Sequence, residues 1–281
     1  MNNLVEDIYK ALEPLCKEEP VEISDSVIEK FGEDMKKVLR SWSTPEKRPN
    51  TFKLRMSNVG KPLRQLWYDN KYPEKSNFEP KTFIKFLYGH ILEEVVLMLV
   101  RLSGHEVTDE QKEITIEGIK GHMDCKIDGK VVDVKSASGY AFRKFKYGGL
   151  AEDDPFGYLA QLSGYEQAEK QEDSGFLVIN KESGELCLYC PEDLEKPNTA
   201  MRIKNISSIL KEHMPPERCY PTIPEGSKGN LKINKNCSYC PHKFRCYHDA
   251  NDGQGLRTFR YSKGFVYLTK VVKEPNVEEV L

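Results

Sequence analysis

The sequence predicts an α/β protein, and three observations support that class. Two segments with strand character flank Asp128-Gly129, a dipeptide that favours a two-residue type I′ turn because both positions need φ > 0. Residues 82–103 carry apolar side chains at helical spacing. Residues 176–179 and 186–189 have the composition of two further strands, joined by a turn that contains glycine. Helices and strands therefore both occur along the middle of the chain.

The composition is that of a soluble globular protein. The chain has 281 residues, 38% hydrophobic and 31% charged, enough for one large domain or two modest ones. A net charge of −2 gives no overall attraction for nucleic acid, so any such contact depends on local basic patches. No apolar run approaches the roughly 20 residues of a membrane span, and the first residues do not resemble a signal peptide. We therefore expect a cytoplasmic protein with no membrane partner, whose clustered cysteines bind metal before they form disulfides.

The elements before the long helix suggest no chemistry. Residues up to about 50 look helical and acidic, and residues 43–49 look like a linker. The next expected element is a short helix that buries Leu63, Leu66 and Trp67. We divide the chain into a helical region at 1–50, a core at 51–214, a cysteine-cluster subdomain at 215–250 and a C-terminal tail at 251–281.

The helix expected over 82–103 is the clearest element, because Gly104 suits the position just after a helix end. His90 lies on its apolar stripe, and Glu94 follows one turn later. Two interpretations stay open. His90 is either a satisfied core residue, or the helix supplies His90 and Glu94 to a metal site.

The hairpin holds the strongest candidate site. Folding the chain at its turn places Asp124 opposite Asp133, with Cβ atoms roughly 5 Å apart. Two carboxylates at that distance repel unless a cation lies between them, and a divalent metal is the simplest solution. Lys135 follows two residues later on the same face as Asp133, where its ammonium can hold a phosphate or an attacking water. The alternative is a solvated hairpin face, but the strand is rich in valine and a buried charge favours a site. The same turn pairs Ile127 with Lys130, Lys126 with Val131 and Cys125 with Val132.

Two stretches after the hairpin carry polar groups that could meet a substrate. Residues 140–147 alternate cations with aromatic rings, which suits either phosphate contacts with base stacking or an amphipathic helix with a basic outer face. A helix opens at Asp154-Pro155, an N-cap followed by proline at the first helical position. Gln161 and Tyr165 share one face of that helix.

The C-terminal region contains a cysteine cluster. Cys237 and Cys240 form a CxxC pair, Cys246 follows, and Cys219 lies upstream. Four thiolates satisfy a tetrahedral zinc ion or an iron–sulfur cluster. Chance clustering is a poor explanation for this spacing.

Five motifs occur in a fixed order: Gly89-His90 with Glu93-Glu94, Gly121-His122-Met123-Asp124, Asp133-Val134-Lys135, Gln161-Leu162-Ser163-Gly164-Tyr165, and Cys237, Cys240 with Cys246. Together they resemble the RecB-like branch of the PD-(D/E)XK nucleases over roughly residues 51–250. The resemblance is strongest to small phage exonucleases and to the CRISPR-associated and AddB-type iron–sulfur nucleases. It implies a restriction-endonuclease-like α/β core, with a mixed central sheet flanked by helices.

This resemblance also implies an activity, the hydrolysis of DNA phosphodiester bonds with Mg²⁺ or Mn²⁺. The metal ligands that it implies are His90, Glu94, Asp124, Asp133 and the backbone carbonyl of Val134. Lys135 would position the attacking water or help to deprotonate it. Gln161 and Tyr165 would orient the DNA strand.

The chain departs from the family at the first cysteine. Iron–sulfur relatives place that residue ahead of the core, where this chain has Lys61-Pro62-Leu63-Arg64. Cys219 is the expected replacement, so that a 4Fe–4S cluster and Zn²⁺ both stay open.

The family implies an exonuclease that trims single-stranded or frayed DNA ends, with replication or recombination proteins as partners and the host cytoplasm as its location if it is phage-encoded. An endonuclease or junction resolvase on the same core is one alternative. A non-catalytic nucleic-acid-binding protein built around the cysteine metal cluster is the other.

Overall fold

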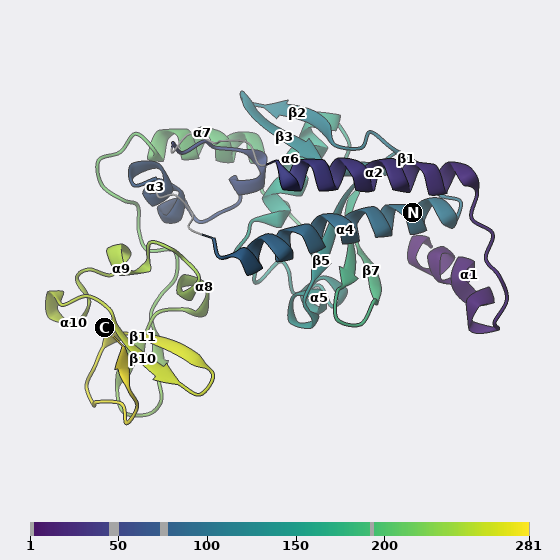
Figure 1. Ribbon diagram of the computed structural model, residues 1–281. Helices are drawn as coiled ribbons and strands as arrows, with labels where there is room; N and C mark the ends of the chain where they lie inside the picture. The colour runs from purple at the N-terminus through teal and green to yellow at the C-terminus, as the bar shows by residue number, and fades with distance from the viewer. Residues whose placement is uncertain (1–2, 45–50, 74–77, 192–193, 281) are drawn as a thin grey trace. The chain divides into compact units, whose positions relative to one another are not determined.

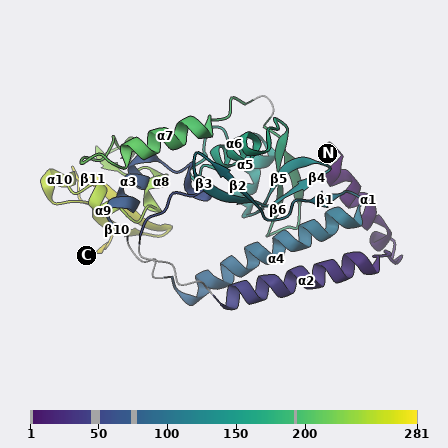
Figure 2. The same cartoon turned by 90° about the horizontal axis from the view of Figure 1, so that it is seen from above.

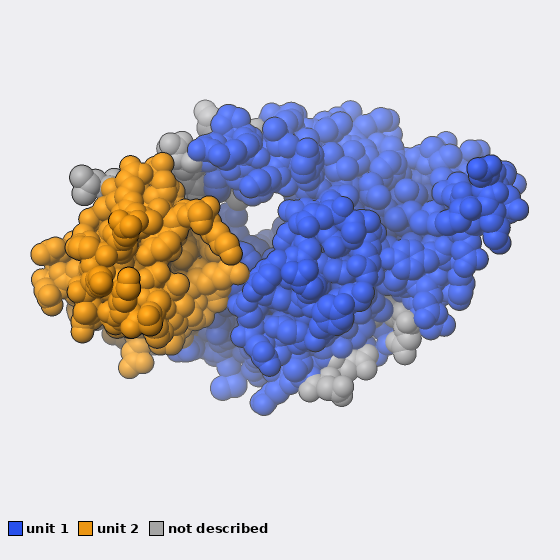
Figure 3. All heavy atoms as spheres, turned by 90° about the horizontal axis from the view of Figure 1, so that it is seen from below, with its two compact units in different colours: residues 1–60, 74–205 blue, residues 61–73, 206–281 orange. Residues whose placement is uncertain are grey.

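The structure is a computed structural model that describes residues 3–44, 51–73, 78–191 and 194–280. The predicted linker at 43–49 lies largely outside these residues. The chain forms two compact units, one of residues 1–60 and 74–205 and the other of residues 61–73 and 206–281 (Figure 3). Among the described residues, no helix is both long and apolar enough to span a bilayer.

A five-stranded sheet forms the centre of the first unit (Figure 1). Its strands, in spatial order, are β1 (Val107–Thr108), β4 (Cys125–Ile127), β5 (Lys130–Ala137), β6 (Ser174–Asn180) and β7 (Leu186–Tyr189). The pair β5 and β6 is parallel, whereas the other neighbours are antiparallel. The sheet is therefore mixed, as expected, and the two strands predicted near 176–179 and 186–189 are both present.

Helices cover both faces of this sheet. On one face, α1 (Leu4–Cys16) and α4 (Pro80–Leu102) share a hydrophobic core with β4, β5, β6 and β7. The helix α2 (Asp25–Ser43) lies along α4 (Figure 2). On the other face, α5 (Gly139–Lys146) and α6 (Tyr158–Glu169) pack on β5 and β6. A mixed sheet flanked by helices on both faces confirms the predicted fold class.

The hairpin at Asp128-Gly129 has the predicted register. The pairs Cys125 with Val132, Lys126 with Val131 and Ile127 with Lys130 are all present. Both turn residues have positive φ, 50° and 78°, as a type I′ turn requires.

The expected strand near 112–118 leads not into this hairpin but into a hairpin of its own. β2 (Lys112–Ile116) pairs with β3 (Ile119–Met123) in a separate two-stranded sheet. The reason is a second turn with positive φ at Glu117 and Gly118. Gly121 of β3 lies against the short 3₁₀ turn η1 (Met56–Asn58), since a Cβ there would meet the Met56 side chain at 2.5 Å.

The long helix begins and ends close to the predicted positions, and Gly104 has φ +85° just beyond it. Its burial differs from the prediction, because His90 is exposed rather than on a buried stripe. The helix expected at Asp154 begins instead at Tyr158. Asp154 nevertheless caps it, because its carboxylate accepts hydrogen bonds from the amides of residues 157, 158 and 159 at 2.9 Å each.

The second unit is built around a five-stranded antiparallel sheet. Its strands, in spatial order, are β12 (Glu279–Val280), β10 (Arg257–Tyr261), β11 (Gly264–Lys270), β9 (Asn230–Lys232) and β8 (Ile223–Glu225). Its helices are α3 (Leu63–Lys71), α8 (Lys235–Ser238), α9 (Lys243–Cys246) and α10 (Ala250–Gly253), and α7 (Thr199–Ile209) runs across the boundary between the units. Residues 251–280 are therefore not a tail, because three of the five strands come from them.

Candidate functional site

Asp124 and Asp133 lie near each other, as the hairpin predicts, but Asp124 lies just before the paired part of its strand. Asp124 lies between the end of β3 and the start of β4, and its Oδ2 accepts a hydrogen bond of 2.8 Å from the backbone N–H of Val134. Asp133 lies in the middle of β5 and is only 1% exposed. The carboxylate of Asp124 is thus fixed beside the residue that follows Asp133.

Lys135 completes the predicted group. Its ammonium forms an ion pair with Oδ2 of Asp133 and lies 5.4 Å from the ring centroid of Tyr158. Burial lowers the pKa of Lys135, but the charges of Asp133 and Asp124 outweigh it, so the pKa is raised. Oδ1 of Asp133 is buried, and no described residue donates a hydrogen bond to it. An acceptor of this kind requires a cation or a donor from outside the chain.

A third carboxylate, Glu93 of α4, faces the same group. Burial and then the charge of Asp124 raise the pKa of Glu93 to about 8. Burial and then the charge of Asp133 raise that of Asp124 to about 7. Gln111 Nε2 donates a 3.0 Å hydrogen bond to Oε1 of Glu93. The sequence offered a signal, since Glu93 is within the first motif, but adjacent helical residues point about 100° apart and the sequence does not say which of Glu93 and Glu94 faces the sheet.

The structure places Glu94 elsewhere. Its carboxylate lies within 4.8 Å of those of Asp34 and Glu110. Lys30 bridges Asp34 and Glu110, and Arg101 forms an ion pair with Glu110 at 2.8 Å. His90 is exposed on α4, one turn before Glu93, so spacing of three residues puts these two on one helix face. The helix thus presents Glu93, with His90 beside it, rather than Glu94.

The donor set fits a hard divalent cation. Asp124, Asp133 and Glu93 offer carboxylate oxygens, although oxygens of all three do not lie within 4.8 Å of one another in the described structure, and the backbone carbonyl of Val134 is the further donor that the sequence predicts. Oxygen donors of this kind suit Mg²⁺ and Mn²⁺. A cation between these carboxylates would give the buried oxygen of Asp133 a partner. It would also lower the raised pKa values of Asp124 and Glu93, because a positive charge favours the ionised carboxylate.

Gln161 and Tyr165 are close together, and of the two only Tyr165 is buried. Tyr165 is 2% exposed, and its hydroxyl donates a 2.8 Å hydrogen bond to the carbonyl of His122. Nε2 of Gln161 donates to the same hydroxyl at 2.6 Å. Because His122 is two residues before Asp124, these side chains fix the end of β3 and with it the position of Asp124.

The stretch 140–147 forms the amphipathic helix α5, which buries two of its four aromatic rings. Phe142 and Phe145 are 1% and 3% exposed, so neither of these rings can stack on a base, whereas Tyr140 and Tyr147 are 53% and 72% exposed. Lys144 and Lys146 form ion pairs with Asp153 and Glu185. The interpretation as an amphipathic helix with a basic outer face is confirmed.

The four cysteines all lie in the second unit. Arg64 Nε donates to Sγ of Cys246 at 3.1 Å. Backbone amides of Gln65 and Arg64, at the start of α3, donate to Cys219, while burial raises the pKa of that thiol. The described residues contain no three cysteine sulfurs within 4.8 Å of one another, whereas ligands of tetrahedral zinc would be about 3.8 Å apart. Four cysteine sulfurs suit a metal centre that prefers thiolate ligands, but they lie farther apart than the ligands of one zinc ion.

The raised pKa values predict an unusual pH dependence of stability in metal-free protein. Asp124 and Glu93 hold protons in the folded state that they release when unfolded, where their pKa values are 3.8 and 4.5. The free energy of unfolding should therefore fall as pH rises from about 5.5 to 8.5. Thermal melting in EDTA measures this fall, and Mn²⁺ should raise Tm more at the higher pH, because it binds the deprotonated carboxylates. The Glu93→Gln/Asp124→Asn double variant is the control. An equal pH slope in both proteins would contradict the assignment.

Comparison with known proteins gives fold-level similarity to solved structures only. No protein-family model matches the chain, and no curated protein sequence matches it. The chain is similar to the solved structure of SSO0001, with 18% identity, a TM-score of 0.40, and coverage of 76% of this chain and 94% of that one. It is similar to a phage-related exonuclease from Haemophilus somnus 129PT, with 12% identity, a TM-score of 0.41, and coverage of 57% and 92%. It is similar to an alkaline exonuclease from Laribacter hongkongensis, with 14% identity, a TM-score of 0.35, and coverage of 55% and 89%. With TM-scores below 0.5, the functional argument rests on the site's own geometry.

Proposed function

We propose that this protein is a metal-dependent deoxyribonuclease that hydrolyses phosphodiester bonds from DNA ends. The observation that carries the proposal is the group of three carboxylates around Lys135: Asp133 is buried in the central strand β5, and Asp124 and Glu93 lie half-buried beside it. Buried acids that no chain cation fully neutralises are rare unless a ligand completes them. The order Asp124, then Asp133-Val134-Lys135, then Gln161 and Tyr165 is the order of the nuclease motifs.

Each residue then has a definite task. Asp124, Asp133, the Val134 carbonyl and Glu93 would hold Mg²⁺ or Mn²⁺, with His90 on the neighbouring helix turn as a further donor. When bound, the ion supplies charge to the scissile phosphate and lowers the pKa of water. Lys135 remains protonated because its pKa is raised, so its role is to hold the phosphate or the attacking water, not to remove a proton.

Tyr165 acts through the position of Asp124. Tyr165→Phe keeps the buried ring but removes the hydrogen bond to His122, so we expect kcat on DNA to fall by about 10-fold while KM is unchanged. A single lost hydrogen bond should lower Tm by only about 2–5 °C. Tyr88→Phe, at an exposed position of α4, is the matched control and should leave both constants unchanged. A raised KM with normal kcat would instead indicate a direct DNA contact.

We further propose that Cys219, Cys237, Cys240 and Cys246 hold a structural metal centre. A 4Fe–4S cluster is larger than one ion and so accommodates the wide spacing of the sulfurs, with zinc as the alternative.

Purification without oxygen tests the cysteine centre. An iron–sulfur cluster gives a brown protein with broad absorption near roughly 400 nm, and zinc gives a colourless protein with one bound ion. Cys240→Ser should lower Tm because metal binding contributes to folding energy, whereas Cys16→Ser, at an exposed site in α1, should not. A metal-free protein whose Tm is unaffected by Cys240→Ser would refute the centre.

The direct test of activity is incubation of linear DNA with Mg²⁺ or Mn²⁺, with EDTA as control. A nuclease shortens the DNA only with metal, whereas a binding protein built around the cysteine centre would shift the DNA without cleaving it. An endonuclease or junction resolvase would cut internally. Partners from replication or recombination would fit an enzyme that trims ends.

A further inference from the structure

We propose that the second unit binds single-stranded nucleic acid by stacking an unpaired base in an aromatic pocket between α9 and the strands β10, β11 and β12. The inference deepens the proposed function, since it adds a binding site for the same class of substrate. None of the pocket residues belongs to the group around Asp133.

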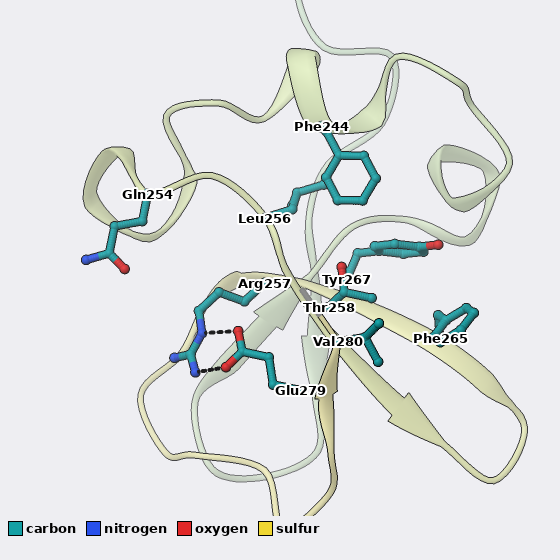
Figure 4. Close-up of a pocket in the computed structure, with 9 residues that line it drawn as sticks. All are labelled: Phe244, Gln254, Leu256, Arg257, Thr258, Phe265, Tyr267, Glu279 and Val280. Atoms are coloured by element: carbon teal, nitrogen blue, oxygen red, sulfur yellow. Dashed lines mark hydrogen bonds and ion pairs between the residues drawn. The ribbon is translucent and has the colours of Figure 1, made fainter.

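The pocket has a volume of about 470 Å³, and three aromatic rings line it (Figure 4). Phe244 and Tyr267 meet edge to face, with ring centroids 5.7 Å apart and planes at 81°. Phe265 is two residues before Tyr267 in β11 and therefore lies on the same face of the sheet. Phe244 and Phe265 are each 51% exposed. Aromatic rings that are about half exposed to solvent provide a surface on which a planar base can stack.

The remaining walls are apolar, polar but uncharged at Gln254 and Thr258, or paired in an ion pair. Leu256 and Val280 contribute aliphatic surface. Arg257 also lines the pocket, but its guanidinium donates to both carboxylate oxygens of Glu279, at 2.8 and 2.6 Å (Figure 4). Arg257 also donates to both carboxylate oxygens of Glu274, at 2.7 and 3.1 Å, so two carboxylates already neutralise its charge and it does not attract a ligand.

Lys243 supplies the cation that such a site needs. Its Nζ lies 5.3 Å from the ring centroid of Phe244 and 5.0 Å from that of Tyr267. Within the described part of the chain, no carboxylate forms an ion pair with it. On the other side, the guanidinium of Arg260 lies 5.6 Å from the ring of Phe265, but it forms an ion pair with Glu278 at 3.5 Å, so Lys243 is the cation on which the proposal rests. An ammonium over two rings can meet a backbone phosphate while the attached base stacks beside it.

The distribution of charge favours a polyanion. Residues 61–73 and 206–281 contain 15 Lys and Arg against 9 Asp and Glu, a net charge of +6. The whole chain is at −2, so the unit with the catalytic group carries −8. Charge asymmetry of this size is typical of nucleic-acid binding. Aromatic rings add a requirement for unpaired bases, because the bases of a closed duplex already stack on one another.

The test measures binding with cleavage switched off. The full chain carries Asp133→Asn, and its affinity in EDTA for a labelled thymidine oligonucleotide of about 20 residues is measured by fluorescence anisotropy. An oligonucleotide of equal length with abasic sugars has the same phosphates but nothing to stack. Phe244→Leu/Phe265→Leu removes the exposed rings but keeps apolar volume, and Phe244→Tyr/Phe265→Tyr keeps the rings.

We expect the Leu pair to weaken binding of the thymidine strand by about 5- to 100-fold and to leave the abasic strand unchanged. The Tyr pair should bind as the parent does. Lys243→Gln should weaken both strands and reduce the salt slope of log K by about 0.7. Equal binding of the thymidine strand by the Leu pair and the parent would overturn the proposal, as would equal losses on both strands. Ring-dependent binding in this test, together with no cleavage by the protein in which Asp133 is intact, would uphold the pocket and reject the nuclease.

Discussion

Asp133→Asn should abolish DNA cleavage, with a loss of at least about 10³-fold in turnover under Mg²⁺. The side chain is isosteric, so the packing around β5 is preserved while the charge that faces Lys135 is removed. The loss should therefore come from the failure to hold a cation and from a Lys135 whose partner has become neutral. Initial rates on end-labelled linear DNA measure the effect.

DNA binding by the Asp133→Asn protein should be as strong as that of the parent or stronger, because one buried negative charge near the phosphate is gone. The matched control is Asp173→Asn, which removes an exposed partner of Lys130 and should leave turnover unchanged. If the Asp133→Asn protein is folded, as its Tm would show, and still turns over DNA at a near-normal rate, then Asp133 is not part of the active site.

A closed circular duplex should survive conditions in which linear DNA is degraded to short products. The unit that carries Asp124, Asp133 and Lys135 has a net charge of −8, so its overall charge does not attract duplex DNA. Asp133 is 1% exposed and the Lys135 side chain is 21% exposed, so the reacting phosphate must approach a recessed group. A single strand at an end or a fray is narrower than a duplex and can enter such a site more easily.

The comparison is a time course of one plasmid, relaxed and closed in one sample and linearised in the other. We expect at least about 100-fold faster loss of the linear form, and slower degradation as salt rises, because phosphate contacts release counterions. A nicked circle or a circle with a single-stranded gap is the control that separates the need for an end from the need for unpaired bases. Equal rates on closed and linear molecules would make the protein an endonuclease.

The sequence by itself determined the features that depend on local geometry. Asp128-Gly129 specifies its turn, because few residue pairs adopt positive φ at both positions without cost. Strand alternation then puts Asp133 and Lys135 on one face, and the register of that hairpin follows from the turn. The long helix ending near Gly104 follows from helical periodicity in the same way.

The tertiary structure alone decided which side chains of those elements meet. Glu93 rather than Glu94 joins Asp124, because the packing of α4 on β5 selects one helix face, and that packing involves residues distant in sequence. Tyr165 is a buried support instead of a DNA contact, since its hydroxyl reaches a carbonyl 43 residues earlier. Phe142 is likewise buried because α5 packs on the central sheet, a contact between segments that periodicity alone does not reveal.

The second unit shows most clearly what sequence patterns do not predict. Its strand β11 pairs with β9 from 230–232, and the pocket forms where Phe244 of α9 meets residues of β10, β11 and β12. Periodicity reports how one segment alternates, but which face is buried and which stays open depends on contacts between segments. The sequence therefore predicts which residues could take part in chemistry, whereas the fold decides which of them come together in one site.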